Sequence, residues 1–406
     1  MKKALMYASV ASMIQQFNMD NIRLLMDGGY QVDVACNMKE GSTISADKIQ
    51  AMEQTLREMG CGVYHIPVPR KVTALGAIFQ SFRLSKQRMN EGAYDLIHCH
   101  SPIGGMICRL ANRCSRHYAK TKMIYTAHGF HFYQGAPRKN WLLYYPMERF
   151  CGRFTDTLIT INREDHALAE RKFRLKKGGR VAYVPGIGID PDKIDHVALQ
   201  PIRQELHIPE GDFLMLSVGE LNDNKNHALV LRAMKELPET VHYAICGQGP
   251  NASALKGLAE ELGLGERLHL LGYRSDVPGI VKACDLFVFP SKREGLSVAL
   301  MEAMACRRAV ACSGIRGNTD LIDPAGGALF DPADVDSCAR AIGGLLDRDR
   351  AALGAHNREK VLGFSREKVG AMMRDICRSL TTSGSSWWTG TPGICIFWKN
   401  SAGAAM

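Results

Sequence analysis

The chain has 406 residues, about twice the usual domain length, so we expect two domains with separate cores. Its composition, 46% hydrophobic and 23% charged, excludes a disordered chain. The net charge of +10 and the pI near 9.0 indicate a negatively charged partner such as a nucleotide, a phospholipid headgroup or nucleic acid. Nucleic acid is disfavoured because the basic residues are dispersed and lack a stacking platform.

Strand-like runs alternate with helical segments in two series along the chain. The first series comprises residues 4–10, 31–36, 62–68, 94–100, 122–128, 157–162 and 181–186. The second comprises residues 213–219, 241–246, 268–273, 285–290, 308–313 and 327–331. This alternation predicts an α/β fold with two parallel, doubly wound sheets of the Rossmann type.

The first run, in "MKKALMYASVASM", has features of a signal peptide, since two lysines precede a short apolar stretch. We favour a buried strand, because a helix, a turn and a second strand follow it. No run of about 18 apolar residues predicts a membrane-spanning helix. The 13 cysteines form no C-x-x-C pair and lie mostly in apolar runs, so we expect free thiols in a reducing compartment, the cytoplasm.

A segment rich in glycine and proline, residues 185–203, predicts the domain junction. We expect one domain over residues 1–190, a second over 191–365, and a C-terminal helix over 366–382 that returns towards the first. Residues 383–406 lack a helical or strand period. This irregular tail is interpreted as a weak interfacial anchor, a disordered tail or a reading-frame artefact.

In doubly wound sheets, ligands bind beyond the carboxyl ends of the strands. The residues that follow the strand-like runs fall into two groups, one in each domain, and therefore predict a site in the cleft between the domains. They are His98, His100, His128, Gly219, Gly247 and Glu294.

The stretch "SKREGLSVALMEAMA", residues 291–305, carries two glutamates on either side of a predicted helix start. Ser297 is a natural N-cap, so the amides of Gly295, Leu296, Ser297 and Val298 form an anion site. Glu302 lies about 7.5 Å further along the helix axis. Carboxylates spaced in this way suit the two ends of an extended ligand better than one bond, although a solvated Glu294 and a surface Glu302 are the alternative.

Two glycine-containing loops are further candidates. Lys225 and Asn226 follow Gly219 in "SVGELNDNKNH", where Lys225 would reach a diphosphate or would be an ordinary exposed lysine. Gly247 and Gly249 in "ICGQGP" form an incomplete nucleotide fingerprint or a plain turn.

Histidines in "DLIHCHSP" and "TAHGFHFY" permit a metal site, but their spacing is unlike that of compact tetrahedral sites. We therefore expect no metal. We expect His128 or His131 to face a substrate, and His98 or His100 to be a hydrogen-bonded packing residue.

Two basic segments with apolar residues, 69–92 and 138–150, suit helices that rest on an anionic membrane. Packing on the sheet with a solvated basic face is the equal alternative. Trp141, Tyr144 and Tyr145 in the second segment would line an acceptor groove or an interface.

Taken together, these motifs resemble the GT-B glycosyltransferases of family 4 (group 1) over residues 3–380. "EGLSVALME" is similar to the family's E-x7-E motif, "SVGEL" with Lys225 and Asn226 to its diphosphate loop, and "SVASMIQQFNMDNIRLL" with "GFHFYQGAP" to the EpsD-type exopolysaccharide transferases.

The resemblance implies an acceptor-binding first domain and a nucleotide-sugar-binding second domain. It implies a retaining, metal-independent transferase without a cofactor, which moves a hexose or N-acetylhexosamine from a UDP-sugar to a lipid-linked or polysaccharide acceptor in exopolysaccharide or capsule synthesis.

For the site, the resemblance implies catalytic roles for His128, Glu294 and Lys225. Donor contacts would come from the residues of the two loops and of the helix start: Gly219, Lys225, Asn226, Gly247, Gly249, Glu294, Gly295, Leu296, Ser297 and Glu302. Glu294 would hold donor-sugar hydroxyls, Glu302 the ribose, and Lys225 with the amides the diphosphate.

The sequence departs from the family in two places. Glu220 stands where an arginine usually follows the loop glycine, and "SVASMIQQFN" replaces a glycine-rich loop. Glu220 leaves open a catalytically silent partner that binds the nucleotide sugar, and a nucleotide-sugar 2-epimerase of the same fold is a further alternative. The location implied is cytoplasmic, at the inner face of the plasma membrane.

Overall fold

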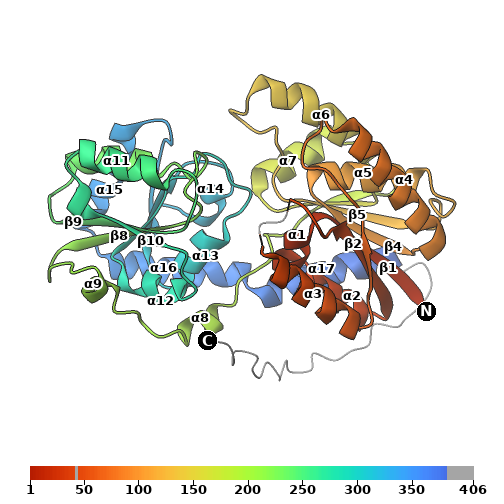
Figure 1. Cartoon of the computed structure of the whole chain (residues 1–406), viewed down its shortest axis with the longest axis horizontal. Coiled ribbons are helices and arrows are strands. Elements are labelled where there is room, and N and C mark those ends of the chain that lie inside the picture. Colours follow the sequence, from red (N-terminus) through yellow and green to blue (C-terminus); the bar gives the residue numbers. More distant parts are fainter. Residues whose placement is uncertain (42–43, 382–406) are drawn as a thin grey trace.

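The computed structural model describes residues 1–41 and 44–381. Two α/β units lie side by side in it and are joined by two chain crossings (Figure 1). The irregular tail at 383–406, with its interpretations, lies outside the described residues.

The first unit is built on a seven-stranded sheet in which every neighbouring pair is parallel, in the order β3-β2-β1-β4-β5-β6-β7. Its strands are β1 Lys2–Val10, β2 Tyr30–Asn37, β3 Gly62–His65, β4 Leu96–His100, β5 Lys122–Ala127, β6 Thr157–Thr160 and β7 Arg180–Tyr183. The opening residues thus form an interior strand next to the central strand β4, and the winding direction reverses between β1 and β4.

Helices cover both faces of this sheet because its strands are apolar on both sides. Along β1, Ala4 and Met6 enter one core cluster, while Leu5 and Tyr7 enter the other. The first cluster is shared with α1 Ala11–Phe17, α2 Met19–Asp27 and α3 Ala46–Glu58, and the second with α4 Leu75–Gly92, α5 Pro102–Arg113, α6 Arg138–Gly152 and α7 Arg163–Lys172.

The second unit repeats the design with six parallel strands in the order β10-β9-β8-β11-β12-β13. The strands are β8 Phe213–Val218, β9 Val241–Cys246, β10 Leu268–Gly272, β11 Leu286–Phe289, β12 Ala309–Ser313 and β13 Gly327–Phe330. The helices are α8 Pro191–Asp195, α9 Ile202–Glu205, α10 His227–Ala233, α11 Ala252–Glu261, α12 Val277–Ala283, α13 Val298–Ala305, α14 Asn318–Leu321, α15 Val335–Leu346 and α16 Arg350–Val361. Short 3-10 turns lie at η1 Met234–Glu236, η2 Gly265–Arg267 and η3 Leu362–Phe364.

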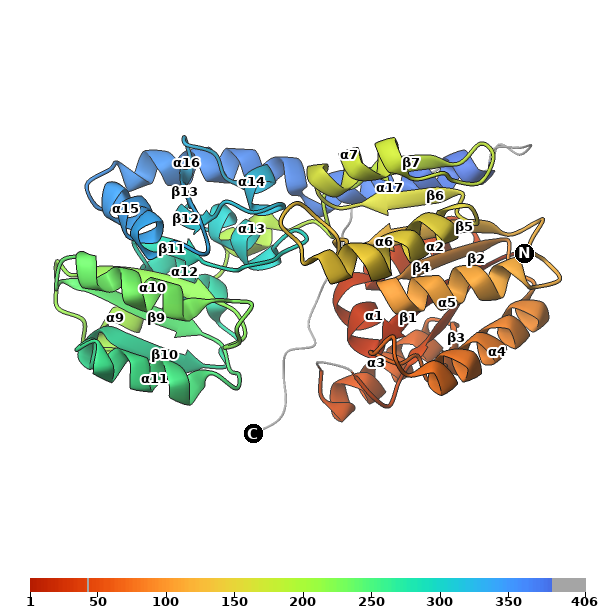
Figure 2. The same ribbon diagram turned by 90° about the horizontal axis from the view of Figure 1, so that it is seen from above.

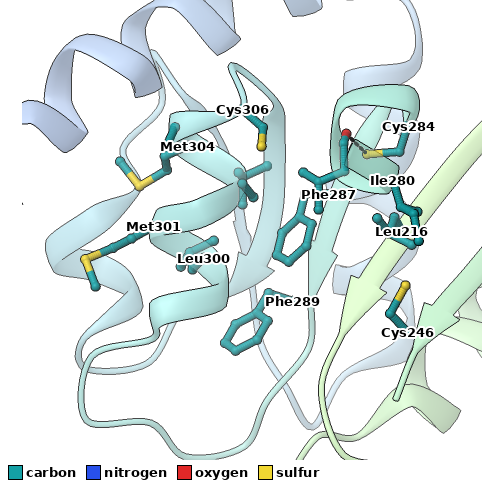
Figure 3. Close-up of a cluster of buried hydrophobic side chains, with 14 of the residues drawn as sticks. Leu216, Cys246, Ile280, Cys284, Phe287, Phe289, Leu300, Met301, Met304 and Cys306 are labelled. Carbon is teal, nitrogen blue, oxygen red and sulfur yellow. Dashed lines mark hydrogen bonds between the residues drawn. The ribbon is translucent and has the colours of Figure 1, made fainter. Parts of the chain in front are cut away.

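The core of this unit fixes the helix that follows β11. Phe287 and Phe289 point from β11 towards α13, where Leu300 lies beside them (Figure 3), and Met301 and Met304 of the same helix belong to the same core cluster. Because α13 is apolar nearly all round and well buried, its start beside the strand end is held rigidly.

The chain crosses between the units twice, and the two crossings are hydrogen-bonded to each other. The Ile189 amide donates to the Phe364 carbonyl at 3.0 Å, and the Arg366 amide donates to the Ile189 carbonyl at 2.8 Å. Helix α17, Arg366–Thr381, then lies along the first unit, with Val369, Met373 and Ile376 in its core (Figure 2).

The cysteines that the structure describes are all free thiols, and all but Cys114 are buried. In the same part of the chain, no helix combines the length and apolarity that a membrane span requires.

Candidate active site

Candidate residues from both units lie at the carboxyl ends of the strands, where the units touch at Gly129 and Gly295. In the first unit His100 is the last residue of β4 and His128 follows β5. In the second unit Lys225 lies in the loop after β8 and Glu294 in the loop after β11. The strand-end rule selected His100, His128 and Glu294, whereas Lys225 was a candidate from the loop that follows Gly219.

Glu294 and Lys225 are joined by an ion pair. The Lys225 Nζ lies 2.7 Å from Glu294 Oε1, and it also sits 4.9 Å from the centre of the Phe289 ring. The side chain of Lys225 is 21% exposed and that of Glu294 is 16% exposed, so both remain accessible to a ligand. The two candidate residues thus form one charged group at the carboxyl edge of the second sheet.

Asn226 holds the loop that carries Lys225. It adopts a left-handed backbone conformation with φ 58°, and its Nδ2 donates to the carbonyls of Pro290 and Pro332 at 3.2 and 3.0 Å. Both amide hydrogens are thereby used, so Asn226 fixes the loop after β8 against the end of β11.

Gly247 and Gly249 have a packing role. A Cβ on Gly247 would overlap the Gly219 carbonyl oxygen, and a Cβ on Gly249 would overlap that of Leu221. The Gly219 amide donates to the Cys246 carbonyl at 3.0 Å, and the Leu221 amide to that of Gln248 at 3.0 Å. These glycines let the two loops lie backbone to backbone.

Helix α13 begins as the sequence predicts. Ser297 is its N-cap, with its Oγ accepting from the Leu300 amide at 3.3 Å. The backbone amides of Gly295 and Leu296, which come before Ser297, lie at the helix start next to Glu294. Glu302, further along α13, is largely buried without a cation within ion-pair distance among the described residues. Burial raises its pKa, and the charge of Arg366 opposes that rise.

A cluster of three histidines, His98, His100 and His128, lies on the first-unit side of the site. His98 Nε2 is 2.8 Å from Thr126 Oγ1, and His100 Nδ1 is 3.0 Å from His128 Nε2. His98 and His100 are buried, hydrogen-bonded packing residues, as expected. Burial lowers the pKa of His128 to about 4 and that of His98 to about 3, so both rings are neutral at neutral pH.

The contact of His100 with Met6 indicates which ring nitrogens of His100 and His128 carry protons. Its Nε2 lies 3.3 Å from the Met6 sulfur, which accepts weakly and cannot donate. We infer that His100 carries its proton on Nε2 and accepts from His128 at Nδ1. His128 then presents Nδ1 as an acceptor, which suits a sugar hydroxyl.

The two halves of the site touch through backbone. A Cβ on Gly295 would overlap the His128 carbonyl oxygen, and a Cβ on Gly129 would lie 3.1 Å from the Gly295 Cα. Glycine at both positions lets the donor loop and the histidine loop meet without side chains between them.

Arg316, in the loop after β12, is the residue that the sequence analysis missed. Its Nη1 lies 2.5 Å from Asp165 Oδ1, its Nη2 donates to the Phe130 carbonyl at 2.5 Å, and its Nε donates to the Glu294 carbonyl at 3.2 Å. The side chains of Arg316 and Asp165 are 3% and 0% exposed. The strand-end rule applied to residues 308–313 would have pointed to this loop.

The two basic segments that could rest on a membrane form helices α4 and α6, and their surroundings differ. In α4, Arg88 lies over the Tyr64 ring at 4.2 Å, and the buried Ser85 and Met89 face the sheet, which favours the packed alternative there. In α6, Trp141 and Tyr145 pack on Phe132, while Tyr144 borders a cavity.

No group of three or more His, Cys, Asp or Glu side chains within residues 1–41 and 44–381 is arranged to hold a metal ion.

Two parallel Rossmann-like units that meet at such a cleft define the GT-B class of glycosyltransferases. The chain spans the whole of a solved structure of this class, sucrose-phosphate synthase from Thermosynechococcus elongatus, with a TM-score of 0.73 at 19% identity, over 95% of this chain and 100% of that one. This likeness shows the fold.

Family models and relatives give the family. Residues 14–186 match the glycosyl transferase 4-like domain, and residues 200–360 match the glycosyl transferases group 1. The chain is 33% identical over 384 residues to EpsD of Bacillus subtilis (strain 168), a protein assigned as a glycosyltransferase, covering 92% of this chain and 96% of that one. The chain therefore belongs to the group 1 (family 4) glycosyltransferases.

A second relative acts on a lipid-linked sugar. The UDP-Gal:alpha-D-GlcNAc-diphosphoundecaprenol alpha-1,3-galactosyltransferase of Escherichia coli is 26% identical over 344 residues, covering 82% of this chain and 84% of that one. The chain is thus a group 1 glycosyltransferase related to lipid-linked sugar transferases.

Proposed function

We propose that the chain is a retaining glycosyltransferase that moves a hexose or N-acetylhexosamine from a UDP-sugar to a lipid-linked or polysaccharide acceptor in exopolysaccharide or capsule synthesis. The observation that carries the proposal is the ion pair of Lys225 and Glu294 beside the start of α13, opposite His128. Charge for a diphosphate and acceptors for a sugar are thereby brought to one place.

In this proposal the second domain, residues 191–365, binds the donor. Lys225 leaves Glu294 for the diphosphate, which also receives the amides of Leu296 and Ser297. Glu294 is then released to accept hydroxyls of the donor sugar. Glu302 takes the ribose, where its hydrogen bonds from hydroxyls offset the burial that raises its pKa.

The chemistry follows from where charge develops. As the bond to the anomeric carbon breaks, negative charge grows on the diphosphate, next to Lys225 and the helix amides, which stabilise it without rearrangement. The acceptor hydroxyl attacks from the same face, and the departing phosphate takes its proton. His128 accepts a hydroxyl of the donor sugar at Nδ1 and orients the ring.

Glu220 is the exception in this arrangement, because an arginine is usual at its position. It is exposed, so its charge is largely solvated. Lys225 together with the helix start supplies the positive charge, and no metal ion is required in the proposal.

The first domain, residues 1–190, binds the acceptor. The Escherichia coli relative, whose acceptor is a diphosphoundecaprenol-linked sugar, supports a lipid-linked acceptor. The resemblance of the sequence to EpsD-type transferases implies the role in exopolysaccharide synthesis, and the 33% identity to EpsD supports that resemblance.

Helix α6 suits a membrane surface. Leu142, Leu143 and Phe150 are 79%, 50% and 48% exposed, and at 3.6 residues per turn they share one face of the helix with the exposed Lys139, Pro146 and Arg149, while the exposed Arg153 follows the helix end. An apolar stripe flanked by cations matches an anionic bilayer. We propose that the enzyme works in the cytoplasm, attached peripherally to the inner face of the plasma membrane through α6.

A donor panel tests the function. Purified protein is titrated with UDP and assayed with UDP-, GDP- and dTDP-sugars, with and without alkyl-diphosphate-linked N-acetylglucosamine, in EDTA. We expect UDP binding, acceptor-dependent transfer and retention of the anomeric configuration. Conversion of UDP-GlcNAc without an acceptor would indicate the epimerase, binding without turnover would indicate the silent partner, and absence of binding to any donor would refute the proposal.

A further inference from the structure

A cavity of about 130 Å³ lies in the first domain directly beside His128. Its walls come from α1, from the loops after β4 and β5, and from the inner face of α6, including Met13, Tyr125, His131, Tyr144 and Glu148. None of the donor-loop residues of the second domain borders it. The cavity therefore belongs to the first domain, and two of its lining residues, His128 and Gly129, are next to the donor-loop residue Gly295.

A buried carboxylate lines this cavity. Glu148 is 1% exposed, its Oε1 accepts from the Tyr125 hydroxyl at 2.7 Å, and its Oε2 pairs with Arg109 at 2.7 Å. The two oxygens together offer about four lone-pair positions, and these contacts use two of them. The remaining positions can accept hydrogen bonds from a ligand in the cavity.

A second polar group in the wall has no partner. His131 Nδ1 is buried and makes no hydrogen bond within the described residues, although its ring is held 4.6 Å from that of Tyr144. Burial, assisted by the charges of Arg293 and Arg316, lowers the pKa of His131 to about 4, so the ring is neutral at neutral pH. A buried polar atom without a partner costs stability unless a ligand or water satisfies it.

The part of the wall beside His131 is aromatic. Phe130, Phe132 and Tyr144 border the cavity beside His131, and such rings suit the C–H faces of a sugar. The charges around the cavity also favour a neutral ligand over an anionic one. Arg109 already neutralises Glu148, so an anionic sugar would bring an unpaired negative charge next to a buried carboxylate.

We propose that this cavity is the acceptor subsite and holds the terminal sugar of the acceptor as a neutral pyranose. Glu148 accepts hydroxyl protons from it, and His131 Nδ1 pairs with a further hydroxyl. One hydroxyl of the ring then emerges at His128, next to the donor loop. This inference rests on the proposed function, because it assigns the second substrate of the same reaction.

The test uses the full chain with saturating UDP, and methyl pyranosides as probes. Saturation-transfer NMR is run with the methyl glycosides of glucose, galactose, N-acetylglucosamine and N-acetylgalactosamine, and with methyl glucuronide as the anionic control. The pocket variants are Met13→Trp, which fills the volume, and His131→Phe, which keeps the ring and removes its nitrogens. Glu294→Ala is the matched donor-site control, and Glu148→Gln is added if it folds.

We expect at least one neutral pyranoside to bind, with affinity at least tenfold weaker in Met13→Trp and His131→Phe and unchanged in Glu294→Ala. The UDP affinity of both pocket variants should equal that of the parent. Failure of every neutral probe, equal binding of the glucuronide, or loss of binding in Glu294→Ala alone would overturn the inference. UDP binding and donor turnover judge the proposed function separately.

Discussion

Arg316 offers the sharpest test of how the two domains work together. The substitution Arg316→Met keeps much of the side-chain volume and removes the guanidinium that joins Asp165, the Phe130 carbonyl and the Glu294 carbonyl. Two of these partners lie in the first domain and one in the donor loop. The variant should therefore weaken the contact between the two domains more than it weakens either domain alone.

The expected loss of activity can be estimated from the burial of the ion pair between Arg316 and Asp165. Removing one partner of a buried ion pair costs about 3–5 kcal/mol if the carboxylate stays buried. Here the cleft can open and hydrate Asp165, so the loss is limited to about 1.5–3 kcal/mol, the range for hydrogen bonds to charged groups. Since about 1.4 kcal/mol corresponds to a factor of ten, kcat/KM should fall roughly 10- to 100-fold.

The assay combines donor turnover with a double-mutant cycle. Turnover of the UDP-sugar is measured for Arg316→Met, Asp165→Asn and the double variant, and small-angle scattering reports the mean domain separation. Arg316→Lys keeps the charge without the planar fork and should recover only part of the rate. A kcat/KM within twofold of the parent, or strictly additive single effects, would refute the coupling of Arg316 to catalysis.

The remaining predictions concern the donor site, its pH dependence and the membrane. Lys225→Met and Glu294→Ala should each abolish sugar transfer with unchanged circular dichroism; transfer above a tenth of the parent rate would contradict their roles. Glu302→Gln should weaken UDP binding about tenfold by calorimetry and raise Tm, because burial raises the pKa of the Glu302 carboxyl and disfavours its charge; a lower Tm would count against this. The pKa of His128 is lowered to about 4, so its neutral form favours folding and stability should fall as pH drops from about 6.5 towards 4, with the acid limb of activity below pH 6; an acid limb centred at 6.5 would exclude His128 as the titrating group. Leu142→Asp should reduce sedimentation with phosphatidylglycerol vesicles, and binding of the parent should fall with salt; salt-independent binding would contradict the electrostatic part.

Much of the fold could be predicted because its signals are local. Each strand of the two sheets overlaps a run that the sequence marks as strand-like, although β1, β2 and β7 extend one or two residues beyond theirs, and β1 alternates its side chains between two cores. Ser297 caps α13 as expected, because the capping preference depends on neighbours three residues away. These features do not require knowledge of distant contacts.

What the sequence could not supply are the pairings across long separations. Asp165 and Arg316 lie 151 residues apart, and neither stands out in its own segment. Asn226 was expected at the ligand, yet its amide is used by two carbonyls of other loops. Whether a polar side chain faces a ligand or the framework is decided by which carbonyls the fold brings within reach.

Glu294 connects the donor site to the contact between the domains, because its side chain and its backbone carbonyl have different partners. Its carboxylate pairs with Lys225, and its carbonyl accepts from Arg316. A diphosphate that draws Lys225 away would leave the carboxylate unpaired in a largely buried position, where sugar hydroxyls would be its nearest available donors. The backbone would stay in place through Arg316, which is anchored in the first domain. Donor binding and closure of the cleft would then be coupled through one residue, so the double-mutant cycle of Arg316 should show a larger interaction energy with UDP-sugar bound than without it.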